Sequence, residues 1–437
     1  MIFWGILAVI LGLAFKVRWI SFAGAYLVLG VMLETGYARV SLKRLSYSRE
    51  LLVPGEPAPA RSPVKEAFVG DTLSLRIRVE NRKPLPVLWL RCEDEVPGEE
   101  KIDLQMAQRH WKPGRAILPN HMYLRWFERV EREFEMKCLF RGYLTFGPAS
   151  LTSSDPSGLK ENTATVSGVD TLIVYPRVLR ITVPYDRKEH PLGETPGRAW
   201  LQPDPLEIAG TKPYTPGTPL NQISWKATAR TARLQAKHLL PTFRSQVVVA
   251  LNLSTCEYSW EGVIEDSLES SVCLAASICV FLKSLGIQTG LASNAPGNVS
   301  DPYVYLPPGL SAAHFKRILR TLARVYVPWG EFSETLLYLE RKLNPGAGVI
   351  AVMSHSEPAD WEGLLRIRSL GHPVMAVVLG RDRKVSRYYA SVPVWCPAGP
   401  VDWRSGESVE LVRLRPVEEM EQPVFPSPAG SNRGQGG

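Results

Sequence analysis

Two apolar runs open the chain and constrain its fold most, because they must be buried in a bilayer or in a core. Residues 1–15 read MIFWGILAVILGLAF and residues 19–34 read WISFAGAYLVLGVMLE, with Lys16 and Arg18 between them. Each uncharged run is about 22 Å long as a helix, against about 30 Å of bilayer hydrocarbon. The two cations would be expensive at the centre of one long span. We therefore expect residues 1–35 to form a two-helix membrane hairpin.

A cleaved signal peptide is the alternative interpretation of this segment. Residues 23–25 read Ala-Gly-Ala and resemble a cleavage site. However, a further apolar run follows them, and no basic segment precedes the first run, as a signal peptide would require. The hairpin is the better explanation.

The charges around the two runs bear on their orientation. Four cations follow the second run, namely Arg39, Lys43, Arg44 and Arg49. By the positive-inside rule, they predict that everything after residue 36 lies in the cytoplasm. Lys16 and Arg18 occupy the opposite loop and argue for the reverse orientation. We expect a multi-pass protein of the cell membrane whose soluble domains are cytoplasmic.

The sequence of residues 36–180 has the pattern of short strands separated by turns. In DTLSLRIRVEN, apolar side chains alternate with polar ones at Leu73, Leu75, Ile77 and Val79. A period of two is that of a half-buried strand. Short strands with frequent turns are typical of a β-sandwich. We therefore expect an all-β, Ig-like β-sandwich domain at residues 36–180.

The pattern changes at residue 246, where QVVVALNL begins. Such a continuous apolar run is typical of a parallel strand covered on both faces. GVIAVM and PVMAVVL are further runs of this kind, and helical patterns separate the runs. Strands that alternate with helices predict a doubly wound, parallel α/β domain. We expect this domain at residues 246–403, after a linker at 181–245 and before a disordered tail at 404–437.

One predicted helix, SAAHFKRILRTLARVYV, carries a basic stripe opposite its apolar face. The apolar face comprises Phe315, Ile318, Leu319, Leu322 and Tyr326. The stripe comprises Lys316, Arg320 and Arg324, spaced at i, i+4 and i+8. A solvated face is the plain interpretation of this spacing. The alternative is a docking surface for an acidic partner.

Charge and cysteine spacing exclude several classes of function. The net charge of +8 favours an anionic neighbour, but the cations are spread along the chain, so we expect no nucleic-acid partner. The six cysteines form no C-x-x-C pair and match no zinc spacing. We expect free, mostly buried thiols, which fit a reducing compartment. The chain has no P-loop and no Gly-x-Gly-x-x-Gly motif, so nucleotide binding is unsupported.

The segment 210–239 reads GTKPYTPGTPLNQISWKATARTARLQAKHL and has an unusual composition. It resembles the central signature of the domain of unknown function 58 (DUF58) family, bacterial and archaeal proteins related to von Willebrand factor type A domains. The matching residues are Tyr214, Pro216, Gly217, Trp225, Lys226, Ala229 and Arg230. The resemblance covers nearly the whole chain, because the hairpin, GDTLSLRIRVEN, RGYLTFGP, DPSGL and VYPRV precede the signature in the family's order.

The signature departs from the family pattern at three charged positions. Thr218 follows Gly217 where the family has aspartate, and Asn221 and Ser224 replace an arginine and an aspartate around the isoleucine. We interpret the segment as a rigid strap, in which proline and glycine fix a turn and Trp225 is anchored in the core. The alternative is partner binding by Lys226, Arg230 and Arg233.

The resemblance implies a type A-like domain, whose metal site would lie at the carboxyl edge of the sheet. The implied pattern is Asp-x-Ser-x-Ser after the first strand and an acid after a later one. Here the first loop offers Asn252, Ser254 and Cys256, and the later strand ends in Ser354-His355. A hard divalent cation needs anionic oxygen ligands. We therefore expect a degenerate site with no metal and no cofactor.

A Cys–His nucleophile is a further hypothesis for this edge, because Cys256 and His355 would both lie there. No third group that would orient the histidine is evident, so we expect no catalytic residues and no enzyme. The resemblance implies a MoxR-type AAA+ ATPase as partner. We expect a membrane-anchored adaptor that acts in the assembly or maturation of envelope proteins. The alternative is an extracytoplasmic, metal-dependent adhesion or ligand-binding module.

Overall fold

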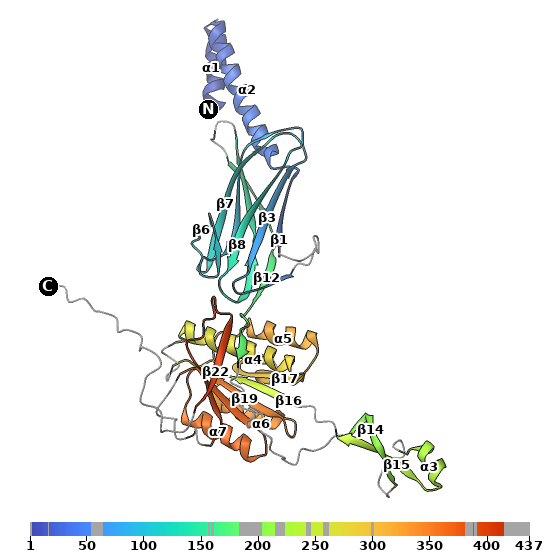
Figure 1. The fold of residues 1–437 in the computed structure, drawn as a ribbon. Helices are drawn as coiled ribbons and strands as arrows, with labels where there is room; N and C mark the ends of the chain where they lie inside the picture. Colours follow the sequence, from blue (N-terminus) through green and yellow to red (C-terminus); the bar gives the residue numbers. More distant parts are fainter. Residues whose placement is uncertain are drawn as a thin grey trace, which may run out of the picture. The chain divides into compact units, whose positions relative to one another are not determined.

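The chain divides into two compact units, Met1–Pro176 and Arg177–Gly437, in the computed structural model (Figure 1). The structure describes residues 2–15, 17–53, 64–155, 158, 161–182, 203–214, 223–241, 246–256, 262–298, 301–380, 388 and 391–414.

The first unit begins with two helices, α1 (Ile2–Ala14) and α2 (Arg18–Ser41), which pack against each other. α2 has 24 residues, or about 36 Å of helix, and most of its large apolar side chains are exposed. By length and composition, α2 could cross a membrane. α4 (Glu265–Ser284) in the second unit passes the same test, but most of it is buried, so it is a core helix.

Strands of three sheets form the rest of the first unit. One sheet has the order β1 (Leu45–Leu52), β3 (Thr72–Asn81), β8 (Arg129–Cys138) and β5 (Ile102–Leu104). The second has the order β11 (Glu161–Val166), β10 (Ala149–Ser154), β4 (Val87–Pro97), β7 (Arg115–Leu124) and β6 (Gln108–Arg109). The third has the order β2 (Val64–Phe68), β12 (Asp170–Tyr175) and β9 (Gly142–Phe146).

The inward side chains of β3 confirm the predicted alternation. Leu73, Leu75, Ile77 and Val79 are all buried, and the polar residues between them are not. Side chains of β1 and β8 reach across to β4 and β7, so the two larger sheets face each other as a β-sandwich. The all-β fold predicted for this region is therefore present.

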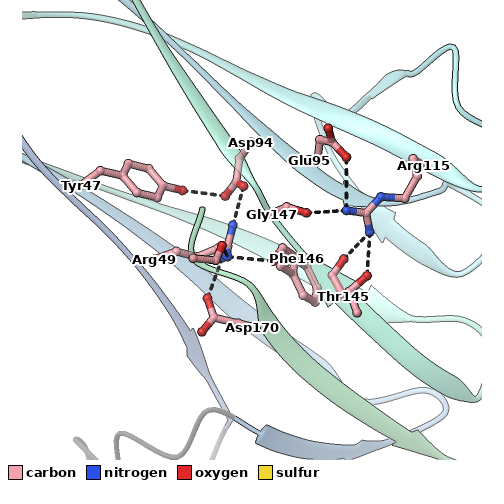
Figure 2. A network of polar contacts seen from close by, with 10 residues as sticks. Tyr47, Arg49, Asp94, Glu95, Arg115, Thr145, Phe146, Gly147 and Asp170 are labelled. Atoms are coloured by element: carbon pink, nitrogen blue, oxygen red, sulfur yellow. Dashed lines mark hydrogen bonds and ion pairs between the residues drawn. The ribbon is translucent and has the colours of Figure 1, made fainter. Parts of the chain in front are cut away.

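A polar network joins the sheets inside this sandwich (Figure 2). Arg49 on β1 forms a buried ion pair with Asp94 on β4, and its Nε donates to Asp170 Oδ2 at 2.9 Å. Arg49 Nη2 donates to the carbonyl oxygens of Phe146 and Gly168. The hydroxyl of Tyr47 donates to Asp94 Oδ2 at 2.7 Å, and burial raises the pKa of this phenol, which therefore stays a donor.

The large sheet of the second unit is mixed. Its order is β13 (Arg180–Thr182), β22 (Ser408–Leu414), β21 (Val394–Pro397), β20 (Val374–Val378), β19 (Gly348–Met353), β16 (Gln246–Leu251), β17 (Gln288–Asn298) and β18 (Asp301–Gly309). β16 is parallel to β17 and β19, whereas β18 and β22 are antiparallel to β17 and β21. The expectation of a wholly parallel sheet is wrong at these two strands.

Helices cover both faces of this sheet (Figure 1). α4 and α5 (Ala312–Leu322) pack together on one face, and α6 (Phe332–Lys342) and α7 (Pro358–Ser369) on the other. From β16 to β21, the strand order reads 3-2-1-4-5-6, the order of a doubly wound sheet. The predicted apolar face of α5 is correct for Phe315, Ile318 and Leu322, which are buried.

Three boundaries differ from those expected. α2 extends to Ser41, whereas the hairpin is predicted to end at residue 35. Residues 408–414 form β22 within the large sheet, so the predicted tail at 404–437 is wrong for this stretch, where Val409 and Leu411 are buried. Residues 415–437 lie outside the described residues. β13 pairs in parallel with β22, so residues 180–182 belong to the second unit rather than to the sandwich.

The signature segment folds into regular elements. β14 (Pro203–Pro213) pairs antiparallel with β15 (Gln235–Pro241), and α3 (Trp225–Thr231) lies between them in the chain. Ile223 forms a bridge with Ala236, and both side chains are buried. The hydroxyl of Thr228 accepts from Gln235 N at 3.0 Å, which fixes α3 on β15. The predicted strap or linker therefore contains regular structure at residues 203–213 and 225–241.

Candidate functional site

The carboxyl ends of β16 and β19 meet at the point where the strand order reverses, which is where open α/β sheets bind ligands. Asn252 directly follows β16 and is buried. Its Nδ2 donates to the carbonyl oxygen of His355 at 3.0 Å, and its Oδ1 accepts from Ser254 N at 2.9 Å. The second contact caps the turn that follows β16. We call Asn252, Ser254, Asn294 and Gly330 the amide edge.

Asn294 on β17 is the centre of the amide edge. Its Nδ2 lies within hydrogen-bond distance of Asn252 Oδ1 (3.1 Å), Ser254 Oγ (3.3 Å) and the carbonyl oxygen of Gly330 (3.2 Å). Its Oδ1 accepts from Leu253 N at 2.9 Å. The side chain is fully buried, so these contacts hold one rotamer in place. Together with the contact of Asn252 to His355, these bonds between neutral groups join four segments of the chain.

The amide edge does not fit a divalent metal ion. Its donor set consists of amides, hydroxyls and carbonyls, and the Nδ2 of Asn294 directs N–H groups into the space between them. A hard cation needs anionic oxygen ligands and is repelled by N–H donors. Among the described residues, no group of three or more His, Cys, Asp or Glu side chains is arranged to hold a metal. A metal-dependent adhesion module gains no support from this edge.

Cys256 and His355 show no catalytic pairing. The sulfur of Cys256 lies 3.7 Å from Thr255 Oγ1, and no hydrogen bond joins it to His355 within the described residues. The Nε2 of His355 is buried without a partner in this part of the chain. All six cysteines are free, and five are buried, as predicted. Burial raises the pKa of Cys92, Cys138 and Cys279 to about 12, which keeps these thiols protonated.

An exposed aromatic side chain adjoins the amide edge. Trp329 donates its backbone N–H to the carbonyl oxygen of Asn294 at 2.7 Å, and the next residue, Gly330, accepts from the side chain of Asn294. The indole of Trp329 is 71% exposed, and Val327 beside it is also exposed. A rigid backbone thus presents an apolar group to solvent. The sequence analysis does not identify Asn294 or Trp329 as site residues. The VPWG turn at residues 327–330 is the sequence feature that could have indicated Trp329.

A depression of about 400 Å³ lies further along the same edge, beyond β20 and β21. Ser354, Gly380 and the loop 397–404 contribute to its lining, together with the first turns of α4. Arg404 stacks over the ring of Trp403 at 4.6 Å and pairs with Asp266 at 3.2 Å. Hydrogen bonds from Ser405 and neighbouring backbone N–H groups lower the pKa of Asp402. This carboxylate therefore stabilises the loop that carries it.

The structure corrects the interpretation of Trp225. The side chain is 68% exposed on α3, so it is not a core anchor. Lys226, Ala229, Arg230 and Arg233 are exposed beside it, and partner binding by the three cations stays a prediction. Tyr214 is half-buried and donates its backbone N–H to the carbonyl oxygen of Leu234. Pro216, Gly217, Thr218 and Asn221 lie outside the described residues.

The basic stripe predicted on α5 is exposed. Lys316, Arg320 and Arg324 all face solvent, although Arg324 lies just beyond the last helical residue. Arg324 lies only five residues before Trp329 in the chain, whereas Trp225 is on a different element, α3. The second unit therefore presents exposed side chains around Trp329, Trp225 and Lys316.

One family model matches part of the chain. The model of the family described as "Protein of unknown function DUF58" matches residues 210–391, which supports the resemblance seen in the sequence over this part. No curated protein matches the chain.

Solved structures give only distant likenesses. A cohesin module from a Clostridium perfringens glycoside hydrolase is 11% identical, with a TM-score of 0.21 over 29% of this chain and 96% of that one. The CARDB domain of a Pyrococcus furiosus protein is 12% identical, with a TM-score of 0.18 over 30% and 90%. Proximal thread matrix protein 1 from the mussel byssus is 14% identical, with a TM-score of 0.23 over 32% and 38%. These values carry no argument about function.

Proposed function

We propose that this protein is a membrane-anchored, non-enzymatic adaptor of the DUF58 family. The observation that carries the proposal is the amide edge: neutral, interlocked side chains occupy the position where an α/β sheet binds its ligand, and Trp329 is exposed beside them. The amide edge itself contains no carboxylate, imidazole or thiol, and Trp329 beside it offers a rigid apolar contact for a protein partner. Exposed tryptophans are frequent anchors of protein interfaces.

A degenerate von Willebrand type A-like domain is part of this proposal. Its support is the 3-2-1-4-5-6 strand order from β16 to β21, with helices on both faces. The proposed partner is a MoxR-type AAA+ ATPase, which the family resemblance implies. The client would be an envelope protein during assembly or maturation. The basic stripe on α5 offers a second contact for an acidic face of the partner.

The third part of the proposed function is the membrane anchor. We infer that α1 and α2 cross the membrane as a hairpin and that both soluble units are cytoplasmic. The exposed apolar side chains of α2 support insertion, and Arg39, Lys43 and Arg44 after its apolar stretch support this orientation. A cysteine engineered near the C-terminus should be protected from an impermeant thiol reagent in intact cells. Labelling of this cysteine without permeabilisation would show that the soluble units lie outside the cytoplasm.

Affinity purification of the full chain from solubilised membranes tests the adaptor role. The wild-type chain should recover an AAA+ ATPase in near-stoichiometric amount, and Trp329→Ala should lose it. Trp111→Ala is the matched control, because it removes an exposed tryptophan of the first unit. Recovery of no stoichiometric protein by the wild-type chain would contradict the proposal.

A further inference from the structure

Four exposed apolar side chains gather at one end of the β-sandwich. Trp126 and Phe127 form the turn between β7 and β8, and each is about two-thirds exposed. Leu88 and Tyr123 are also exposed and lie beside the pairing of β4 with β7 at Val87 and Leu124. We call these four residues the aromatic edge. Apolar groups gathered on a surface mark a contact with another molecule or with a membrane.

The aromatic edge is fixed to the last turn of α2. Lys83 is buried, and its Nζ donates to the carbonyl oxygen of Ser41, the last residue of α2, and to that of Lys43. The carbonyl oxygen of Lys83 in turn accepts from Phe127 N at 3.3 Å. A single residue therefore connects the end of the helix to the exposed turn.

A second connection comes from Tyr37, one turn before the end of α2. Its hydroxyl donates to the carbonyl oxygen of Pro86 at 3.1 Å and accepts from Leu88 N at 2.9 Å. The loop that carries Leu88 is thus attached to the helix as well. The sandwich cannot rotate freely about α2 while these bonds hold, so the aromatic edge keeps a constant place beside the helix.

Cations surround this end of the unit. Those that are exposed and form no ion pair within the described residues are Arg39, Lys43, Arg44 and Arg125. The acids nearby are engaged: Glu80 pairs with Arg82 at 2.9 Å, and Glu128 accepts from Arg125 N. The surface therefore combines exposed aromatic rings with excess positive charge. Aromatic rings favour the membrane interface, and basic groups favour anionic headgroups.

We propose that the aromatic edge inserts into the headgroup layer of the bilayer that α2 crosses, with the four cations resting on anionic lipid phosphates. The inference rests on the proposed membrane anchor. The apolar stretch of α2 ends at Leu33, eight residues before Ser41, or about 12 Å along the helix. A tilt of about 20°, average for such helices, lowers one side of the sandwich toward the bilayer. The proposal places the aromatic edge on that side.

Depth-dependent fluorescence quenching in proteoliposomes tests the proposal on the full chain. A cysteine-reactive NBD probe is attached to Phe127→Cys, Trp111→Cys or Tyr26→Cys, each in a Cys256→Ser background, because the other five cysteines are buried. Trp111 is a matched control: it is 82% exposed but lies near the opposite end of β7. Tyr26, exposed on α2, reports on the anchor itself. The vesicles contain phosphatidylglycerol and lipids with a nitroxide near the headgroup or deep in the chain.

The probe at position 127 should be quenched by the shallow nitroxide, with a blue-shifted emission, and the probe at 111 should not. Changing Trp126 to serine or replacing phosphatidylglycerol by phosphatidylcholine should reduce the quenching at 127. If position 26 is quenched by the deep nitroxide and 127 behaves like 111, the anchor stands and the proposal is overturned. If position 26 is not quenched, the anchor fails and the proposal with it. A blue shift at 127 without quenching by either nitroxide would assign the aromatic edge to a protein contact and overturn the proposal.

Discussion

The side-chain amides of Asn294 and Asn252 contact each other at 3.1 Å, where the carboxyl end of β16 meets β17. Both side chains are buried, and each holds a second segment of the edge: Asn252 reaches the carbonyl oxygen of His355, and Asn294 that of Gly330. The pair therefore positions the loop that presents Trp329. The rigidity of this loop is the physical basis of the proposed docking site.

Removing one amide of this pair should loosen the edge. Asn294→Ala leaves Leu253 N without an acceptor and removes the donor to Gly330. A buried polar group without a partner costs about 1–3 kcal/mol. We expect this loss in the free energy of unfolding, measured by thermal melts in detergent. Asn298→Ala, at an exposed position on the same strand, is the control and should melt like the parent. Equal melting of both variants would show that the amide pair does not hold the edge.

The buried ion pair of the sandwich should be essential for stability. Asp94→Ala leaves the guanidinium of Arg49 buried with only Asp170 as an anionic partner. Breaking a buried pair in this way typically costs about 3–5 kcal/mol. The exposed pair of Arg78 and Glu131 is the control, since Glu131→Ala should cost no more than about 1 kcal/mol. Chemical unfolding followed by near-ultraviolet circular dichroism distinguishes the two, and similar losses would count against the network.

Asp360 should give stability an unusual pH dependence. This carboxyl accepts from Glu357 N in the capping box of α7, and burial raises its pKa to about 6. Because the folded-state pKa exceeds the unfolded one of about 3.9, the folded state binds the proton more tightly. Stability should therefore fall as pH rises from about 4 to about 6, by on the order of 2–3 kcal/mol.

Asp360→Asn isolates this contribution, because the amide keeps the acceptor but does not titrate. The difference in unfolding free energy between wild type and variant, measured from pH 4 to pH 7, should turn against the wild type as pH rises. A difference that moves in favour of the wild type would mean that the pKa of Asp360 is lowered on folding.

The signature segment should depend on Ile223 rather than on Trp225. Ile223 is buried against Ala236, and truncating a buried isoleucine costs about 2–5 kcal/mol. Trp225 is exposed, so Trp225→Ala should change stability by less than about 0.5 kcal/mol. Limited proteolysis between β14 and β15 measures both effects locally. Faster cleavage of Trp225→Ala than of Ile223→Ala would restore the core-anchor interpretation.

The strands that the sequence predicted well are those with regular patterns. Leu73 to Val79 alternate because one face of β3 is solvated, and the runs of β16 and β19 are apolar throughout because both faces are covered. β17 was missed, since QTGLASNAPGN mixes small and polar residues. Its buried Asn294 is tolerated only because partners from two other segments, residues 252–254 and Gly330, satisfy it.

Other features depend on packing that a single sequence does not display. Trp225 was interpreted as buried because tryptophan usually is, but no described element covers its face of α3. β22 follows a polar, turn-rich stretch, so its sequence alone does not indicate a strand. It is held by pairing with the short strand β21 and with β13, which is distant in the chain. Asn252 and Ser254 lie at the carboxyl edge of the sheet, the position that the sequence predicts for them, because the carboxyl ends of parallel strands share one edge.

Site-specific photo-crosslinking from position 329 in native membranes tests the central claim most directly. A photoreactive amino acid replaces Trp329 in the full chain, and the same replacement at Trp111 is the control. The account predicts one predominant protein adduct at position 329, identified as an AAA+ ATPase, and none at 111. The absence of a protein adduct at 329, or the same adducts at both positions, would contradict a partner-docking role for this edge.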